Sequence, residues 1–229
     1  MKIIIHGGFF SESSTNNETK VAKQKALLRI VKASYEYLKT HSALETVVFA
    51  VSMLEDDALF NAGIGSQIQS DGKIRMSAAL MNGETQKMSG VINIENVKNP
   101  IQVAEVLMKE DDRILGGSGA TNYARQHGFE EFSTEIPQRR AEYEAKVKSL
   151  GLGTVGCVAL DKDGKIAVAT STGGKGFELV GRISDSATVA GNYANQFCGV
   201  SLTGVGEDIV SNATAAKIVT RVTDGFSLQ

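Results

Sequence analysis

A short polar turn between two apolar runs constrains the fold of this chain more than any other feature of its sequence. Residues 155–160 read VGCVAL, residues 161–164 read DKDG, and residues 165–172 read KIAVATST. Apolar, valine-rich runs on both sides of an Asp-Gly turn are typical of a β-hairpin. In this hairpin Thr154, before the first strand, is expected close to Thr172, at the end of the second, to within one register step.

Upstream of the hairpin, the sequence predicts one strand followed by helices. Residues 2–6 (KIIIH) are expected as a short buried strand, and helical periodicity starts at Thr19. Ser42 and Glu45 form the pattern of a capping box, in which each side chain satisfies a free backbone amide at a helix start. The second helix would carry an apolar stripe on one face, formed by Leu44, Val47, Val48, Val51 and Leu54.

The other predicted elements are marked by start and stop residues. Asn99-Pro100 predicts a helix start, with a capping residue followed by proline at the first helical position. Residues 119–127 predict a short helix, and the charged stretch 129–152 is expected as a partly helical surface linker. Beyond the hairpin, residues 198–203 predict a strand and residues 207–224 an amphipathic helix.

The composition is that of an ordinary globular protein, and it excludes several classes of partner. The 229 residues include 24 Lys+Arg and 26 Asp+Glu, which gives a formal net charge of -2. No basic field for nucleic acid and no block of like charge for a membrane surface is present. The first apolar run, Ile3–Ile5, is too short for an export signal, so a cytoplasmic protein is expected. Cys157 and Cys198 are expected as buried thiols and not as a disulfide or a zinc site.

Thr154 and Thr172 bring two hydroxyl groups together at the open end of the hairpin, directly after a linker that ends in glycine. A threonine inside a chain is a poor nucleophile because no base lies next to its hydroxyl. Cleavage of the Gly153–Thr154 bond would create an α-amino group with a pKa of about 8, which can take the hydroxyl proton near neutral pH. Glycine before the bond also tolerates the strained backbone that such a cut needs.

The same residues belong to an ordered series of motifs that extends from residue 2 to about residue 225. The motifs are HGG at 6–8, LE at 54–55, FNAGIG at 60–65, MNG at 81–83, GTVG at 153–156, ATSTGG at 169–174, GR at 181–182, DS at 185–186 and TGVGE at 203–207. In this order they resemble the plant-type asparaginase and isoaspartyl aminopeptidase family, which are N-terminal-nucleophile hydrolases. Each motif alone is weak, whereas their succession is highly specific.

The resemblance implies a role for each reacting residue. Thr154 is implied as the nucleophile and, with Gly153, as the site of self-cleavage. Thr172 is implied to hydrogen-bond to Thr154 and to tune its reactivity. Thr203 and Asn61 are implied to form the oxyanion hole, which places donors where negative charge develops.

The resemblance also implies how an amino-acid substrate is bound. Arg182 is implied to hold the α-carboxylate with its two-pronged guanidinium group. Asp185 is implied to receive the α-ammonium group, with backbone groups of Gly204 and Gly206 beside it. The implied reaction is hydrolysis of the side-chain amide of L-asparagine, of β-aspartyl peptide bonds, or of both, with release of L-aspartate.

No cofactor is expected for the chemistry, but the resemblance implies a structural sodium ion. The loop between the second helix and residue 65 resembles the sodium-binding loop of the family. The ion would be surrounded by backbone carbonyls of Leu54, Glu55, Asp57, Phe60, Ala62 and Ile64.

The implied fold is α+β, an αββα sandwich of two antiparallel sheets between helical layers. Residues 1–153 would form the α-subunit portion, including the linker 129–153, and residues 154–229 the β-subunit portion, together making one domain. Family chains continue well past Gln229, so the fold is expected to be incomplete at its C-terminus. The implied assembly is a homodimer of cleaved α/β pairs, acting on a small amino-acid or dipeptide substrate without nucleic acid or membrane.

Three alternatives remain open at this stage. A glycosylasparaginase and a protease of the same superfamily share the threonine chemistry. In the glycosylasparaginase type an aspartate precedes the threonine, so the glycine before Thr154 argues against that alternative. The third alternative is an unprocessed or truncated relative that keeps the fold and binds an amino acid or a partner without turnover.

Overall fold

The predicted hairpin lies inside a six-stranded sheet, and a two-stranded sheet packs against one face of it. The computed structural model describes residues 1–8, 17–145 and 153–227. The strands are β1 (Lys2–His6), β2 (Met76–Asn82), β3 (Lys87–Ile94), β4 (Ile114–Gly116), β5 (Val155–Leu160), β6 (Ile166–Thr172), β7 (Asn192–Ala194) and β8 (Gly199–Ser201). The helices are α1 (Asn17–Leu38), α2 (Ala43–Glu55), α3 (Pro100–Leu107), α4 (Gly117–Gln126), α5 (Pro137–Glu144), α6 (Gly206–Ser211) and α7 (Thr214–Thr223).

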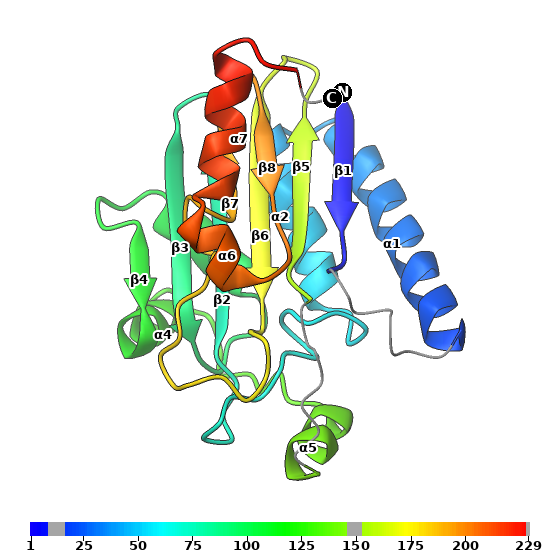
Figure 1. The fold of residues 1–229 in the computed structure, drawn as a ribbon, viewed down its shortest axis with the longest axis vertical. Coiled ribbons are helices and arrows are strands. Elements are labelled where there is room, and N and C mark those ends of the chain that lie inside the picture. Colours follow the sequence, from blue (N-terminus) through cyan, green and yellow to red (C-terminus); the bar gives the residue numbers. More distant parts are fainter. Residues whose placement is uncertain (9–16, 146–152, 228–229) are drawn as a thin grey trace.

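The elements form four layers, in the order helix, sheet, sheet, helix (Figure 1). Helix α2 covers β5 and β6, and α3 covers β2 and β3, on one face of the larger sheet. On the opposite face β7 and β8 pack against β6, and α7 covers these two strands. This arrangement confirms the expected αββα sandwich.

The larger sheet has the order β1-β5-β6-β2-β3-β4 and differs from the expectation in one respect. Its pairs are antiparallel except for β3 and β4, which are parallel. The chain passes from β3 through α3 to β4, and a crossover through a helix is the connection that parallel strands require. The expectation of a wholly antiparallel sheet is therefore wrong at this edge.

The start of α2 follows the predicted capping box. The Ser42 hydroxyl accepts a hydrogen bond from the Glu45 amide at 3.2 Å, and the Glu45 carboxylate accepts one from the Ser42 amide at 2.9 Å. The Ser42 hydroxyl also donates to the Glu45 carboxylate, at 2.7 Å, and this bond, followed by the one from the Ser42 amide, lowers the pKa of Glu45 below its usual range. The predicted stripe is buried at Val47, Val48, Val51 and Leu54, and Leu44 is half-buried against the same core.

Two predictions about helices are corrected by the structure. Helix α3 begins at Pro100 as expected, but the Asn99 side chain does not cap it. The Asn99 amide instead donates to Asp56 Oδ1 at 3.1 Å, which ties α3 to the end of α2. The single helix predicted over 207–224 is two helices, α6 and α7, because Ala213 adopts a left-handed conformation with φ of 46°.

Tertiary contacts explain that break. Directly after it, the Ala215 amide donates to the Ala190 carbonyl at 2.8 Å, so a bond to the turn before β7 replaces one within a continuous helix.

The predicted linker contains α5, which buries no residue, and residues 146–152 of the linker lie outside the described residues. Gln229 also lies outside them.

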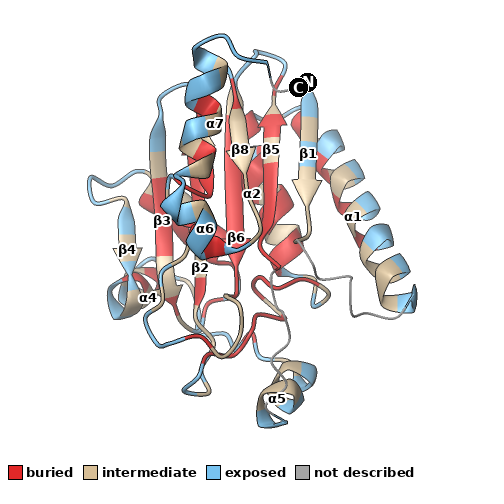
Figure 2. Ribbon diagram, viewed as in Figure 1, coloured by how far each residue is buried: buried red, intermediate tan, exposed pale blue. Residues whose placement is uncertain are grey.

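Strands β5 and β6 are buried along most of their length (Figure 2). Because successive side chains of a strand point to opposite faces of its sheet, both faces of the hairpin are covered. Cys157 packs into the core beneath α2, and Val158 packs into the cluster beneath β7. By the same alternation Thr154 and Thr172 belong to the face that carries β7 and β8. The hairpin therefore directs both hydroxyl groups to one side of the larger sheet.

One buried carboxylate holds the closed end of the hairpin and the start of α2 together. Asp161 Oδ1 accepts hydrogen bonds from the amides of Asp163, at 3.0 Å, and Lys165, at 2.9 Å. Asp161 Oδ2 accepts a third from the amide of Ala43, the first residue of α2, at 3.0 Å. A carboxylate at a helix N-terminus is stabilised by the free amides there. This residue therefore fixes the hairpin against the helix that packs on it.

Both cysteines are free and buried, as expected. Burial raises the pKa of the Cys157 thiol far above its usual range, so it stays protonated and unreactive. In the described parts of the chain, no helix combines the length and the apolar character needed to cross a membrane.

Glu55, at the end of α2, is fully buried between helix and sheet. Its Oε1 accepts hydrogen bonds from the Ser171 hydroxyl at 2.6 Å and the Ile101 amide at 3.1 Å. Burial raises the pKa of Glu55 to about 8, and these donors offset only part of the shift. An unfolded glutamate has a pKa of about 4.3. The folded protein therefore holds a proton on Glu55 at neutral pH that the unfolded chain does not hold.

This difference predicts a pH dependence of the free energy of unfolding. Between about pH 4.3 and 8 the folded state binds the extra proton, so stability falls as the pH rises, by up to about 1.4 kcal/mol per pH unit, and levels off above pH 8. Glu55→Gln lacks this titration. In urea unfolding, raising the pH from 6 to 9 should therefore lower the free energy of unfolding of the wild type more than that of the variant. Glu36→Gln, at an exposed position, is the control; an equal wild-type-to-Glu55→Gln difference at both pH values would contradict the assignment.

Candidate active site

The register of β5 and β6 places the two predicted threonines side by side. Val155 pairs with Ser171, so the next position of the same register sets Thr154 opposite Thr172. Both residues are buried, although they lie at the end of the sheet. The Thr154 hydroxyl lies 3.2 Å from the Ser186 hydroxyl, which belongs to the segment between β6 and β7. A buried serine therefore orients the side chain of Thr154.

The Thr172 hydroxyl accepts a hydrogen bond from the Gly174 amide at 3.2 Å. This bond turns the chain sharply as it leaves β6 and keeps Gly174 beside the hydroxyl. The hydroxyl can still donate one hydrogen bond of its own. A direct hydrogen bond from Thr172 to Thr154 stays a prediction.

A pocket that is partly open to solvent contains most of the predicted site residues. Its lining consists of Gly153, Thr154, Thr172, Gly174, Lys175, Arg182, Ser184, Asp185, Ser186, Gly204 and Gly206. Two expected residues, Asn61 and Thr203, lie outside this lining.

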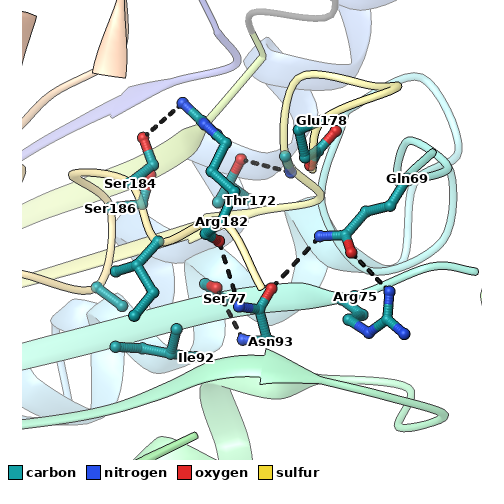
Figure 3. Close-up of a pocket in the computed structure, with 13 residues that line it drawn as sticks. Gln69, Arg75, Ser77, Ile92, Asn93, Thr172, Glu178, Arg182, Ser184 and Ser186 are labelled. Atoms are coloured by element: carbon teal, nitrogen blue, oxygen red, sulfur yellow. Dashed lines mark hydrogen bonds between the residues drawn. The ribbon is translucent and has the colours of Figure 1, made fainter. Parts of the chain in front are cut away.

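Arg182 and Asp185 are joined by a serine between them. Arg182 Nη2 donates to Ser184 Oγ at 3.0 Å, as Figure 3 shows, and the Ser184 hydroxyl donates to Asp185 Oδ1 at 2.8 Å. A Cβ atom at Gly206 would collide with Ser184 Oγ and would lie only 2.8 Å from Asp185 Oδ1. The glycine therefore leaves the space in which the cation and the anion of the pocket are held together.

Asp185 has one carboxylate oxygen without a partner. Among the described residues, no hydrogen-bond partner reaches the buried Oδ2 atom. Burial raises the pKa of Asp185, and the hydrogen bond from Ser184 offsets part of the shift. A buried carboxylate with a free oxygen is stabilised by any cation that reaches it. Asp185 is therefore suited to receive an ammonium group.

The guanidinium group of Arg182 is fixed from a second side by Glu207. Arg182 Nε donates to Glu207 Oε1 at 2.8 Å, and Lys175 Nζ lies 3.3 Å from the same oxygen. Hydrogen bonding to Arg182 is the main reason that the pKa of Glu207 is lowered to about 2. With Nε and Nη2 engaged, the end of the guanidinium that carries Nη1 remains for a carboxylate.

The two residues predicted for the oxyanion hole differ in their surroundings. Thr203 Oγ1 is buried and has no hydrogen-bond partner among the described residues. The Asn61 side chain donates to the Gly174 carbonyl and accepts from the Gln67 amide at 3.0 Å. Asn61 also packs directly against Gly153, because a Cβ added to Gly153 would lie 2.9 Å from the Cβ of Asn61. Asn61 therefore flanks the bond between Gly153 and Thr154.

A second small cavity adjoins the first (Figure 3) and shares five lining residues with it, Thr172, Gly174, Arg182, Ser184 and Ser186. Within it, Gln69 donates to Asn93 Oδ1 at 3.4 Å, and Asn93 donates to the Arg182 carbonyl at 3.2 Å. These bonds connect β3 to the backbone of Arg182. The side chains that line this cavity therefore hold the backbone of Arg182 in place.

The loop predicted to bind sodium brings backbone carbonyls close together. The Ile64 amide donates to the Glu55 carbonyl at 2.7 Å, which folds the loop back onto the end of α2. A Cβ at Gly65 would lie 2.7 Å from the Ala58 carbonyl oxygen and 2.8 Å from that of Phe60. No group of three His, Cys, Asp or Glu side chains suited to a metal occurs in the described parts of the chain. An ion held here would therefore be bound by carbonyl oxygens, as expected of a hard monovalent cation.

Sequence reasoning missed four polar residues around the pocket, namely Lys175, Ser184, Ser186 and Glu207. Ser186 and Glu207 belong to the DS and TGVGE motifs, whose other members had been given roles. Ser184 lies between Arg182 and Asp185 in sequence, but this position alone does not show that its side chain joins the two. Lys175 directly follows the second glycine after Thr172, but nothing in the sequence shows that it faces the pocket.

A four-layer αββα fold, with a threonine just before a strand of the larger sheet and a charged pocket around it, is that of an N-terminal-nucleophile hydrolase. The sequence pattern of the asparaginase family matches residues 1–148 and 133–229, and the chain belongs to this family.

Curated relatives agree with this membership. The isoaspartyl peptidase/L-asparaginase of Synechocystis sp. is 47% identical over 99% of this chain and 74% of its own length. The isoaspartyl peptidase/L-asparaginase of Xenopus laevis is 37% identical over 98% of this chain and 77% of its own length. The plant-type L-asparaginase of Pyrococcus abyssi is 35% identical over 99% of this chain and 81% of its own length.

Gly8 makes the closest backbone approach to the residue before Thr154. It has a positive φ of 109°, and a Cβ there would lie 2.6 Å from Gly153 Cα. Gly8→Ala should therefore lower the free energy of unfolding by about 2 kcal/mol or more, through backbone strain and this collision. Gly119→Ala is the control, because Gly119 lies in α4 with open space around it, and alanine there should stabilise by about 0.5–1 kcal/mol. Equal stability changes in urea unfolding would contradict the contact.

Proposed function

We propose that this chain is a threonine amidohydrolase that releases L-aspartate from L-asparagine and from β-aspartyl peptides. The observation that carries the proposal is one pocket in which the Thr154 hydroxyl lies together with one arginine, Arg182, and one buried carboxylate, Asp185. The relatives named isoaspartyl peptidase/L-asparaginase, up to 47% identical, support the same reaction.

Substrate binding follows from the charges of the pocket. The α-carboxylate would be held by the free end of the Arg182 guanidinium, and the α-ammonium group by Asp185. Ser184 joins the two residues, so their spacing is fixed before the substrate arrives. A substrate held in this way directs its side chain toward Thr154.

The chemistry requires a cut before Thr154. Removal of the Gly153–Thr154 bond frees an α-amino group, which takes the proton of the Thr154 hydroxyl while the oxygen attacks the side-chain carbonyl of the substrate. Negative charge then develops on the carbonyl oxygen, and the hydroxyl of Thr203 and the side-chain amide of Asn61 would donate to it. The amine leaves with a proton, and water hydrolyses the aspartyl ester on Thr154 to release aspartate.

The self-cleavage itself is supported by the surroundings of the scissile bond. Gly153 is enclosed by Gly8 on one side and Asn61 on the other, so the backbone before Thr154 has little freedom. The Thr154 hydroxyl already has a hydrogen-bond partner in Ser186. Such confinement favours attack by the hydroxyl on the preceding carbonyl. Thr172→Ala should slow this step, because Thr172 lies next to the nucleophile.

A sodium ion in the loop after α2 is part of this proposal. The carbonyls of Leu54, Glu55, Asp57, Phe60, Ala62 and Ile64 would surround it, and Glu55 is also bound to Ser171, one residue before Thr172. The ion would thus stabilise the end of β6 without taking part in the chemistry. We also propose a homodimer of cleaved pairs as the assembly and the cytoplasm as the location.

The alternatives make different predictions. A glycosylasparaginase would require the pocket to admit a sugar-bearing amide, and a protease would require a channel for a longer chain. A non-catalytic relative would keep Gly153 and Thr154 joined.

Intact mass spectrometry after incubation at neutral pH tests the self-cleavage. The wild-type chain of 24.3 kDa should yield two fragments, the second beginning at Thr154. Thr154→Ala should stay intact and release no aspartate, because it lacks the hydroxyl, whereas Thr154→Ser should cleave slowly. Thr85→Ala, in an exposed turn, is the control for substitution of a threonine. A Thr154→Ala chain that still breaks after residue 153 would refute the mechanism.

The titration of Asp185 predicts how KM changes with pH. Burial raises the pKa of Asp185 above the ordinary aspartate value of about 3.9, and only the charged form binds an ammonium group. As the pH falls through this raised pKa, KM for L-asparagine should rise, at a higher pH than an ordinary aspartate would give. Asp185→Asn should have a high KM that changes little with acidity, and Asp112→Asn, in an exposed turn, should follow the wild type. An acid-side KM rise that persists in Asp185→Asn would assign the titration elsewhere.

A further inference from the structure

The pocket contains a second cation that the proposed reaction does not use. Lys175 follows Gly173 and Gly174, where the chain leaves β6, and it lines the pocket together with Thr154. Its side chain is 43% exposed, whereas that of Arg182 is 14% exposed. The pocket therefore has one cation in its depth and one at its mouth.

The ion pair of Lys175 leaves its charge available to a ligand. Lys175 Nζ lies 3.3 Å from Glu207 Oε1, while Arg182 Nε donates to the same oxygen at 2.8 Å. Arg182 thus already neutralises Glu207 through the shorter contact. An exposed lysine–carboxylate pair contributes little free energy, so Lys175 can exchange Glu207 for another carboxylate at low cost.

The charges of the two substrate classes differ in one group. L-asparagine has one carboxylate and one ammonium group, which Arg182 and Asp185 would bind, and its leaving group is ammonia. A β-aspartyl dipeptide has the same two groups and a second carboxylate, on the residue that leaves. With the first carboxylate bound deep in the pocket, this second one lies beyond the scissile amide, toward the mouth. The lysine lies at that opening.

We propose that Lys175 binds the carboxylate of the leaving residue, so that this pocket distinguishes β-aspartyl dipeptides with a free C-terminus from those whose C-terminus is blocked. This inference rests on the proposed function and adds to it the residue that sets this preference. The charged residues that line the pocket are two cations, Arg182 and Lys175, and one anion, Asp185, which match the two carboxylates and one ammonium group of such a dipeptide. Glu207, which contacts both cations, lies outside the lining. The Lys175 side chain acts as a point charge without fixed geometry, so the leaving residue can vary in its own side chain.

The test compares three substrates in two variants. The substrates are L-asparagine, β-aspartyl-leucine and β-aspartyl-leucine amide, whose leaving residue has no carboxylate. In Lys175→Met, the ratio of kcat/KM for β-aspartyl-leucine to that for its amide should fall about fivefold, mostly through KM, as expected for loss of one half-exposed charge pair. Lys175→Arg should restore most of the ratio, since it keeps the charge.

Lys162→Met is the matched control, because Lys162 is exposed in the turn at the closed end of the hairpin, away from the pocket. Added salt should lower the same ratio in the wild type and leave it nearly constant in Lys175→Met. An unchanged ratio in Lys175→Met, or an equal loss on all three substrates, would overturn the assignment while the hydrolase function stands. A wild-type chain that cleaves none of the three would instead overturn the proposed function, and this inference with it.

Discussion

The antiparallel pairing of β5 with β6 is the constraint on which the rest of the site depends. Because side chains alternate along both strands, one register sets Thr154 opposite Thr172 and directs both to the face of β7 and β8. A shift by one residue would turn Thr154 into the core beneath α2, where Cys157 and Ala169 now pack. The turn at Asp161 and its bond to the start of α2 hold this register in place.

A second constraint is the absence of side chains where segments meet at the end of that hairpin. A Cβ on Gly8 would collide with Gly153, a Cβ on Gly153 would press on Asn61, and Gly206 leaves the space that Ser184 and Asp185 occupy. The first contact confines the backbone before Thr154, and the second sets the distance between the groups that would bind the substrate. Close backbone packing therefore shapes both the proposed cleavage site and the proposed binding site.

The parts of the fold that the sequence predicted are those with local signals. The hairpin has an Asp-Gly turn and valine-rich strands, and α2 has a capping box at Ser42, so both were found. Strand β2 was missed, because its sequence, MSAALMN, contains no β-branched residue and is buried on both faces, which leaves no alternation to detect. The break at Ala213 was missed because it depends on a bond to Ala190 that only the tertiary structure supplies. For the site, motifs supplied the charged residues, whereas Ser184 and Lys175 became visible only when the pocket was assembled.

The electrostatics of the pocket predict that it favours zwitterions over neutral ligands. Arg182 is held by Glu207 and Ser184, so its orientation does not have to be fixed at the moment of binding. Asp185 is buried with one oxygen unpartnered, an arrangement that costs free energy in the empty pocket and that an arriving ammonium group relieves. A ligand that lacked the ammonium group would leave this carboxylate unpaired, and one that lacked the carboxylate would leave Arg182 unmatched. Discrimination thus arises from what each wrong ligand fails to satisfy, in a pocket whose charges are already in place.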